Sequence, residues 1–205
     1  MGVSKTRALL VDVARQLFAK NGIEETTMND IALASQKGRR TLYTYFSSKE
    51  DIYFAVVESE LAHMSERMFA VAEMEISPEN KIIELIYTRL DAIKEIVYRN
   101  GTLKAEFFRN IWGVEMARKE FDKNQIELFR RVLNEGKFNG IFDVDNTDLV
   151  ASILHYCLKG IEVPYVRGIL TRGMTADSSK PHVTKLVFKA LGNHLNIDSI
   201  IHNKQ

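Results

Sequence analysis

The stretch of sequence that decides the fold is residues 22–54, GIEETTMNDIALASQKGRRTLYTYFSSKEDIYF. Thr27 and Asp30 stand three residues apart, the spacing of a capping box that opens a short helix. Residues 36–38 interrupt the helical pattern, which resumes over 39–46 with apolar residues four apart. Two short helices joined by a tight turn predict a helix-turn-helix module.

The segments on either side complete a three-helix unit. We expect a helix over 5–21 that ends at Gly22, because glycine readily adopts the left-handed conformation that closes a helix. Ser47 and Glu50 predict a second capping box, followed by a long helix over 49–73.

The remainder of the chain is predicted to be a larger helical bundle. Three prolines and 11 glycines leave room for long helices and little for a turn-rich β fold. Glycine at 136 is expected to end one helix, proline at 181 to begin the last, and residues 171–180 to form a loop. The predicted helices cover residues 78–98, 103–112, 121–136, 147–167 and 181–195.

The near-neutral total charge of the chain hides an uneven distribution. Lysine and arginine number 28 and aspartate and glutamate 27, which gives a formal charge of +1. Residues 1–47 contain seven basic and four acidic side chains, so they carry +3 and the remaining 158 residues carry −2. The asymmetry indicates nucleic-acid contact by the first part, although such a charge could equally form a solvated face.

Several classes of protein are not expected from the sequence. Cys157 is the single cysteine, so no internal disulfide can form. No run approaches the ~20 apolar residues of a membrane span, and we predict a soluble cytoplasmic protein with no membrane partner. The five histidines lack metal-ligand spacing and no phosphate-binding loop is present, so we expect no metal, no cofactor and no enzymatic activity.

Residues 22–54, with Phe18 before them, resemble the DNA-binding domain of the TetR family of transcriptional regulators. The C-terminal part is similar to that family only in its helical layout and in a weak echo at residues 160–162. The chain departs from the family pattern at the turn, where Gln36 replaces a glycine, Gly38 replaces a serine cap and Arg40 replaces a common glycine. The elements that carry the resemblance are Phe18, Gly22, Thr26, Thr27, Ile31, Ala32, Thr41, Leu42, Tyr43, Tyr45, Phe46, Ser48, Lys49 and Glu50.

The helix that begins at Arg39 is the expected recognition element. With Leu42 facing inward, Arg40 and Thr44 lie on the opposite face, where arginine can bond guanine and a threonine methyl can touch thymine. Flanking bases and hydroxyls suit phosphates. The resemblance implies backbone contacts by Thr27, Tyr43 and Lys49. The predicted DNA-contacting residues are Thr27, Lys37, Arg39, Arg40, Thr41, Tyr43, Thr44, Tyr45 and Lys49. The alternative is that the tyrosines close a small core and the arginines are solvated.

The resemblance also implies a C-terminal domain that binds a small effector. No cluster of cations is expected to be buried, so we predict an apolar or aromatic effector rather than a polyanion. The candidate ligand-binding residues are Tyr87, Phe107, Phe108, Trp112, Met116, Phe129, His155 and Tyr156. The alternative is that these side chains are ordinary core residues.

Residues 149–161 are apolar around most of the helical circumference, with Ser152, His155 and Lys159 as the polar exceptions. A helix of this kind is buried on several sides. The covering element is either a second copy of the chain or the rest of a monomeric bundle. We expect a homodimer through the helices near 147–167 and 181–195, since a helix-turn-helix protein uses two copies to bind two half-sites.

Together these features predict an all-α protein with a helix-turn-helix DNA-binding domain at residues 1–48 and a helical ligand-binding and dimerisation domain at 49–205. We expect a repressor that binds a palindromic double-stranded DNA operator as a dimer and is released by its effector. The alternative is a helical dimeric binding or scaffold protein whose N-terminal module no longer binds DNA.

Overall fold

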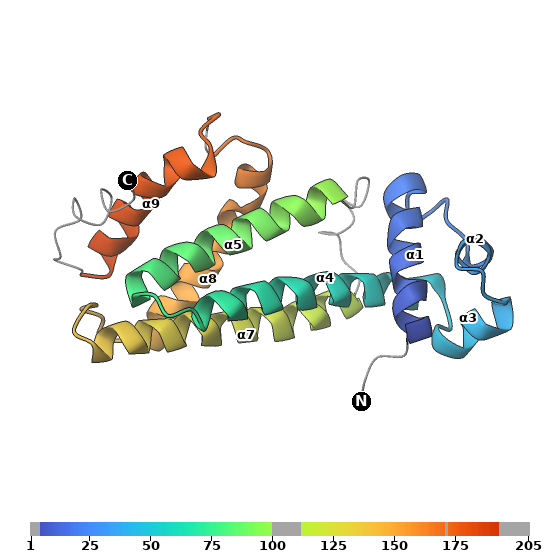
Figure 1. The fold of residues 1–205 in the computed structure, drawn as a ribbon, viewed down its shortest axis with the longest axis horizontal. Helices are drawn as coiled ribbons and strands as arrows, with labels where there is room; N and C mark the ends of the chain where they lie inside the picture. Colours follow the sequence, from blue (N-terminus) through green and yellow to red (C-terminus); the bar gives the residue numbers. More distant parts are fainter. Residues whose placement is uncertain (1–4, 100–111, 171, 193–205) are drawn as a thin grey trace. The chain divides into compact units, whose positions relative to one another are not determined.

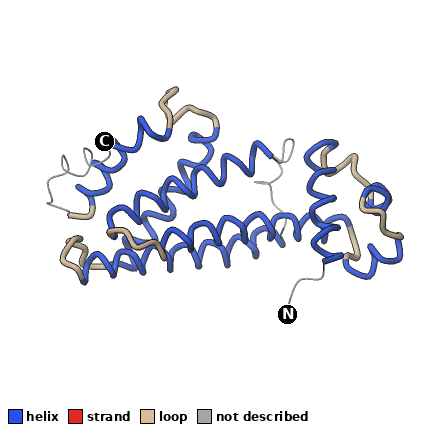
Figure 2. The backbone as a smooth tube through the Cα atoms, viewed as in Figure 1, coloured by secondary structure: helices blue, strands red, loops and turns tan. Residues whose placement is uncertain are grey.

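The computed structural model describes residues 5–99, 112–170 and 172–192, with the side chains of 112–117 left outside that description. This part of the chain is helical with no strand, which confirms the all-α prediction (Figures 1 and 2). The predicted helix at 103–112 lies outside the described residues except at its last position. The helices are α1 (Lys5–Asn21), α2 (Met28–Ala34), α3 (Arg39–Tyr45), α4 (Lys49–Ala72), α5 (Pro78–Arg99), α7 (Trp112–Phe138), α8 (Thr147–Val166) and α9 (Ala176–Ala190).

The chain divides into two compact units. Unit 1 comprises Met1–His63 and Glu95–Glu120, and unit 2 comprises Met64–Lys94 and Phe121–Gln205. Helices α4, α5 and α7 contribute residues to both units. No described helix is long and apolar enough to cross a membrane.

In unit 1, α1–α3 gather around the beginning of α4 (Figure 1). Their shared core contains one apolar stripe from α1 and single apolar residues from α2 and α3, which follows from the helical spacing of the sequence. The fully enclosed members of this core are Leu10, Ala14, Phe18, Ile31 and Leu42. Helix α1 ends as predicted before Gly22, whose φ of 89° lies in the left-handed region.

The predicted capping box at the start of α2 is confirmed. The hydroxyl oxygen of Thr27 accepts a hydrogen bond from the backbone N–H of Asp30 (3.2 Å), and the Asp30 carboxylate accepts one from the backbone N–H of Thr27 (2.9 Å). The hydrogen bonds from Thr27 also lower the pKa of Asp30. The start of α2 is therefore fixed by local chemistry.

The capping box predicted before α4 is wrong by one residue. Ser48, not Ser47, accepts from the third helical N–H, that of Asp51 (3.1 Å). Asp51, not Glu50, reaches back to the chain, where it accepts from the backbone N–H of Ser47 (3.0 Å). The reason is that α4 begins at Lys49, so Asp51 occupies the third helical position that a capping box requires.

Two other helix limits differ from the prediction. Helix α7 continues through Gly136, where the ring of Phe142 packs so closely that an added Cβ would lie 2.1 Å from a ring carbon. Gly140, with φ of 67°, lies just beyond the helix end instead. Helix α9 begins at Ala176 rather than at 181, because Thr175 and Ser178 form a capping box in the segment predicted to be a loop.

Within unit 2 the enclosed helix is α5. No residue from 81 to 93 is exposed, including Arg89, which is 1% exposed. Because a buried charge is costly without a partner, the side chain of Arg89 requires partners, and those it has lie on other helices. Those partners define the interior of unit 2 described below.

Candidate functional sites

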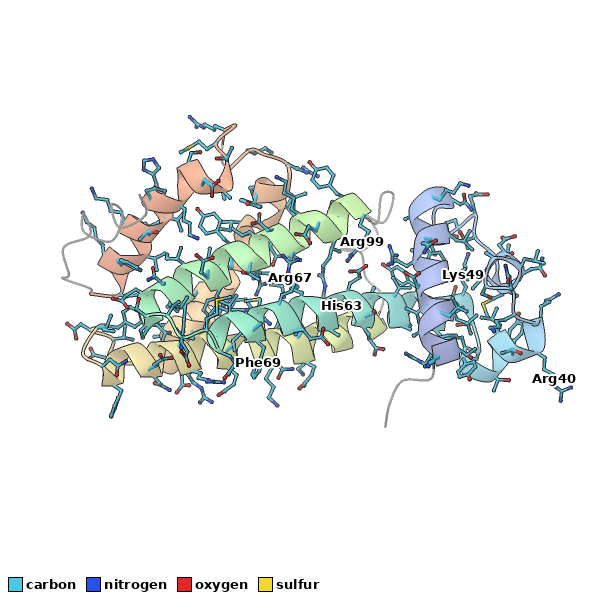
Figure 3. All side chains as sticks on the ribbon, in the orientation of Figure 1. Arg40, Lys49, His63, Arg67, Phe69 and Arg99 are labelled. Carbon is cyan, nitrogen blue, oxygen red and sulfur yellow. The ribbon has the colours of Figure 1, made fainter. Side chains whose placement is uncertain are left out.

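Helix α3 presents a surface of basic and hydroxyl side chains. Arg39, Arg40 and Thr44 are exposed, and Tyr43 and Tyr45 are 47% and 37% exposed. The side chain of Arg40 extends away from α3 into solvent (Figure 3). The hydroxyl of Thr44 donates to the backbone oxygen of Arg40 (2.9 Å), which leaves its methyl group for an apolar contact.

The positive charges on this surface are not neutralised by the described part of the chain. Lys37, Arg39 and Arg40 form no ion pair or hydrogen bond through their side chains with any described residue. The neighbouring carboxylates of Asp30 and Asp51 are held in the helix caps. Unneutralised bases on an exposed face produce a positive potential that suits the phosphates of DNA.

Lys49 is engaged within unit 1. Its ammonium donates to the backbone oxygens of Ile23 (2.6 Å) and Glu24 (3.2 Å), which ties the loop before α2 to the first turn of α4. One of its three N–H groups remains for another acceptor. Thr27 is similar, because its hydroxyl donates to the Asp30 carboxylate (2.6 Å) in addition to accepting a hydrogen bond.

The turn between α2 and α3 has an unusual backbone. Gln36 has φ of 55°, in the left-handed region that favours glycine. Gly38, the N-cap of α3, provides no side-chain hydrogen bond to the helix. Two of the three departures of this sequence from the family pattern, Gln36 and Gly38, therefore fall at a strained position and at a helix start without a side-chain cap.

The predicted ligand-binding residues fall into three groups, which are buried, exposed or outside the described part of the chain. Tyr87, Phe129 and His155 are buried within unit 2, and the Tyr87 hydroxyl lies 2.9 Å from that of Ser179. Burial raises the pKa of Tyr87. Tyr156 is 58% exposed on the other side of α8, although its ring packs edge-on against that of His155. Phe107 and Phe108, and the side chains of Trp112 and Met116, lie outside the described residues.

His155 belongs to a buried polar network centred on Arg89. The guanidinium of Arg89 donates twice to one oxygen of Glu162 (2.9 and 2.7 Å) and lies 2.9 Å from Nδ1 of His155. It also lies over the ring of Phe121. Arginine can only donate, so Nδ1 of His155 must accept, and the proton of the neutral imidazole is on Nε2.

Asp122 continues the network from α7. Nε2 of His155 lies 3.2 Å from its Oδ1, but the N–H does not point at the carboxylate closely enough for a good hydrogen bond. Its other oxygen accepts from the ammonium of Lys159. Burial alone would raise the pKa of Asp122, but the contacts with His155 and Lys159 outweigh it and lower the pKa to about 2.

Apart from His155, the main polar residues of this interior were not predicted from the sequence. They are Arg89, Asp122, Gln125 and Glu162. Gln125 is 1% exposed, and its Oε1 has no hydrogen-bond partner among the described residues. The sequence does contain one sign of these residues. Arg89 and Gln125 lie on the apolar stripes of their helices, where a polar residue needs a partner.

Helix α8 has the reverse of the usual polarity, because its polar residues lie on the buried face and its apolar residues on the exposed face. The face packed inside unit 2 carries His155 and Glu162, with Ala151, Leu158 and Tyr165 beside them. The outward face, by contrast, is apolar. Its exposed residues are Leu149 (56%), Ile153 (50%), Tyr156 (58%), Cys157, Gly160 and Val163 (41%). The apolar character predicted for this helix therefore lies mostly on its exposed side.

No group of three or more histidine, cysteine, aspartate or glutamate side chains in the described ranges could hold a metal ion. Unit 1 offers cationic and hydroxyl groups to an anionic surface, and unit 2 encloses a charge-balanced polar network.

Comparison with known proteins agrees with these features. Residues 10–56 match the family described as bacterial regulatory proteins, tetR family. The HTH-type transcriptional regulator QacR of Staphylococcus aureus is 23% identical over 155 residues, which cover 74% of this chain and 81% of that protein.

Solved structures share the fold over nearly the whole chain. A TetR/AcrR-family transcriptional regulator from Thermobifida fusca has a TM-score of 0.63 at 26% identity, covering 94% of this chain and all of that one. The regulator FadR from Bacillus subtilis, solved in complex with stearoyl-CoA, has a TM-score of 0.68 at 17% identity, covering 88% and 97%. The relatives are transcriptional regulators rather than enzymes. Residues 10–56 thus match the tetR family of bacterial regulatory proteins, and the chain shares over most of its length the fold of TetR-family transcriptional regulators.

Proposed function

We propose that this regulator is a repressor that binds a palindromic operator as a homodimer and leaves it when a small apolar or aromatic molecule binds. Residues 1–48 act as the DNA-binding domain and residues 49–205 as the ligand-binding and dimerisation domain. The soluble, cytoplasmic location expected from the sequence is part of the same proposal.

The observation that carries the proposal is the inverted polarity of α8. A helix that keeps its polar residues inside and exposes Leu149, Ile153 and Val163 presents a contiguous apolar surface to water. Such surfaces mark interfaces. A monomer with α8 at its centre would enclose these side chains, whereas α5 is the enclosed helix of unit 2. A second copy covers the α8 face, and Leu186, which is 71% exposed on α9, is an apolar side chain of the other predicted helix that it can also cover.

The DNA contacts follow from the surface of α3. Arg40 and Thr44 contact base edges in the major groove, and Lys37 and Arg39 contact phosphates. A symmetric dimer presents two such helices to half-sites about 34–36 Å apart, which requires a palindromic operator. Lys49 holds the loop before α2 and uses its remaining N–H on the DNA backbone.

Release by an effector requires the effector to bind more tightly to the conformation that does not fit the operator. The buried members of the predicted set, Tyr87, Phe129 and His155, are the described residues that this ligand would meet. The stearoyl chain of the ligand bound to FadR is apolar, which is the part of that ligand that agrees with this proposal, whereas its coenzyme A part carries anionic phosphates.

The test uses duplex DNA from the region upstream of the protein's own gene, with a random duplex of equal length for comparison. Arg40→Ala is expected to weaken binding to the upstream duplex by about 1–3 kcal/mol and to leave binding to random DNA unchanged, because it removes a base contact. Fluorescence anisotropy at several salt concentrations measures both affinities.

Lys37→Ala is the matched control, since the loss of a phosphate contact weakens both duplexes alike and lowers the salt slope by about one unit. Equal losses on both duplexes for Arg40→Ala would remove the base-contacting role. Absence of salt-sensitive binding by the wild type would favour the alternative of a scaffold protein that no longer binds DNA.

A further inference from the structure

The polar interior of unit 2 lies where three helices meet. Lys81 pairs with Glu135, and further along α5 Arg89 contacts the ring of Phe121. Residue numbers rise along α5 as they fall along α7, so the two helices are antiparallel here. Gln125, one turn of α7 after Phe121, is therefore near the level of Arg89 on α5.

The contacts between α7 and α8 give the same result. Arg130 pairs with Asp148, and Asp122 contacts both His155 and Lys159, so α8 is also antiparallel to α7. In this register Gln125 lies near the level of His155 on α8. Oε1 of Gln125 and Nε2 of His155 are both buried without a hydrogen-bond partner among the described residues, Nε2 lying 3.2 Å from Oδ1 of Asp122 without bonding to it.

The two atoms are chemically complementary to one kind of ligand group. Oε1 of Gln125 can only accept a hydrogen bond, and Nε2 of His155 carries a proton to donate because Arg89 occupies Nδ1. A group that bonds to both must donate and accept. A hydroxyl does so without bringing a charge.

The charges around the two atoms disfavour an ionic ligand. Arg89 is paired with Glu162 and Lys159 with Asp122, so the network has no net charge to offer. A ligand carboxylate would approach the carboxylate of Asp122, and a ligand ammonium would approach the guanidinium of Arg89. The enclosed side chains nearby, such as Phe129, suit an apolar body.

We propose that Gln125 and His155 bind the hydroxyl group of an otherwise apolar effector, with Gln125 Oε1 as acceptor and His155 Nε2–H as donor. This inference rests on the proposed effector function and specifies the ligand's polar group. It also explains why Gln125 occupies a core position, because a buried amide oxygen without a partner destabilises the ligand-free protein.

The probes are 1-naphthol, its parent naphthalene and the charged 1-naphthoate, with 1-octanol and octane as an aliphatic pair. Binding to the full-length protein is measured by calorimetry and by thermal shift. In at least one pair the hydroxylated probe is expected to bind about tenfold more tightly than its parent, the effect of one buried hydrogen bond, and naphthoate is expected to bind most weakly.

Gln125→Leu removes the amide while keeping an apolar side chain of similar size. It is expected to reduce the preference for the hydroxyl to less than about twofold, to leave the hydrocarbon affinity unchanged and to raise the Tm of the ligand-free protein. Gln16→Leu, at an exposed glutamine of α1, is the matched control and retains the preference. Gln125→Met serves the same purpose if the leucine variant does not fold.

Equal affinity for alcohol and parent, a preference that survives in Gln125→Leu, or no binding of any probe up to about 1 mM would each overturn the proposal. A lower Tm in Gln125→Leu without any hydroxyl preference would instead assign the amide to a buried water. Operator release is assayed separately. A probe that binds with the expected preference but does not release DNA would contradict the proposed repressor mechanism and leave the hydroxyl site intact.

Discussion

At the scale of single residues, Gln36 shows how the turn of this chain differs from the TetR family pattern. Its φ of 55° is a conformation in which an L residue other than glycine brings its Cβ too close to its own backbone. The turn is nevertheless closed, since Gln36 donates its N–H to Leu33 and Lys37 donates to Ala32, both at 3.0 Å. The helix-turn-helix geometry is therefore kept at an energetic cost.

Gln36→Gly is expected to raise the free energy of unfolding by about 0.5 kcal/mol. Relief of the left-handed strain gains about 1 kcal/mol, and the greater freedom of glycine in the unfolded chain cancels part of that gain. Urea denaturation followed by circular dichroism measures the change.

The matched control is Gln36→Ala, which removes the same side chain but keeps a Cβ in the strained conformation. It should not stabilise the protein. If alanine stabilised as much as glycine, the side chain of Gln36 rather than its backbone would be the source of the effect.

At the scale of helices, the pairing of α7 with α8 depends on the ionised form of Asp122. Its pKa in the folded protein is about 2, below the ordinary value of 3.8. A carboxylate whose pKa falls on folding adds stability above its unfolded pKa and loses that contribution as the pH falls through the folded pKa. This contribution is thus lost between about pH 4 and pH 2.

Asp122→Asn is expected to reduce stability at neutral pH by about 1–2 kcal/mol, a value discounted because the side chain is 17% exposed and Lys159 is partly solvated. The stability difference from the wild type should shrink between about pH 4 and pH 2. Urea denaturation across this pH range measures it, with Asp177→Asn, at an exposed aspartate of α9, as the control. A difference that stayed constant with pH would contradict the ionic role of Asp122.

The helices of unit 1 were largely predictable because their limits depend on neighbours in the sequence. The cap formed by Thr27 and the stop at Gly22 involve residues within a few positions of one another. The end of helix α7 was not predictable in the same way. A glycine is typical of a helix end, but Gly136 lies inside the helix against the ring of Phe142.

The same distinction applies to the sites. The outward face of α3 follows from helical spacing alone, so the exposure of Arg40 could be predicted. The burial of Arg89 could not, because its partner Glu162 is 73 residues away in the sequence. The apolar character of residues 149–161 was visible, but which side of that helix faced outward depended on the polar network inside unit 2.

At the scale of the whole molecule, the proposed function requires two copies of the chain. A palindromic operator needs two recognition helices, and the exposed apolar face of α8 needs a partner. Two copies related by a twofold axis satisfy both requirements with one interface. Effector binding and operator binding then oppose each other by the same free energy in either order.

The most direct test is the molar mass of the purified protein in solution, measured by light scattering at micromolar concentration. The wild type is expected at twice 23.5 kDa. Ile153→Arg is expected at the single-chain mass, because a dimer through α8 would bury an unpaired charge, whereas a monomer would leave it in water. Leu33→Arg, at an exposed leucine of α2, is the control and should remain at twice the chain mass. A wild type at 23.5 kDa, or an Ile153→Arg variant that stays at twice that mass, would contradict dimerisation through α8.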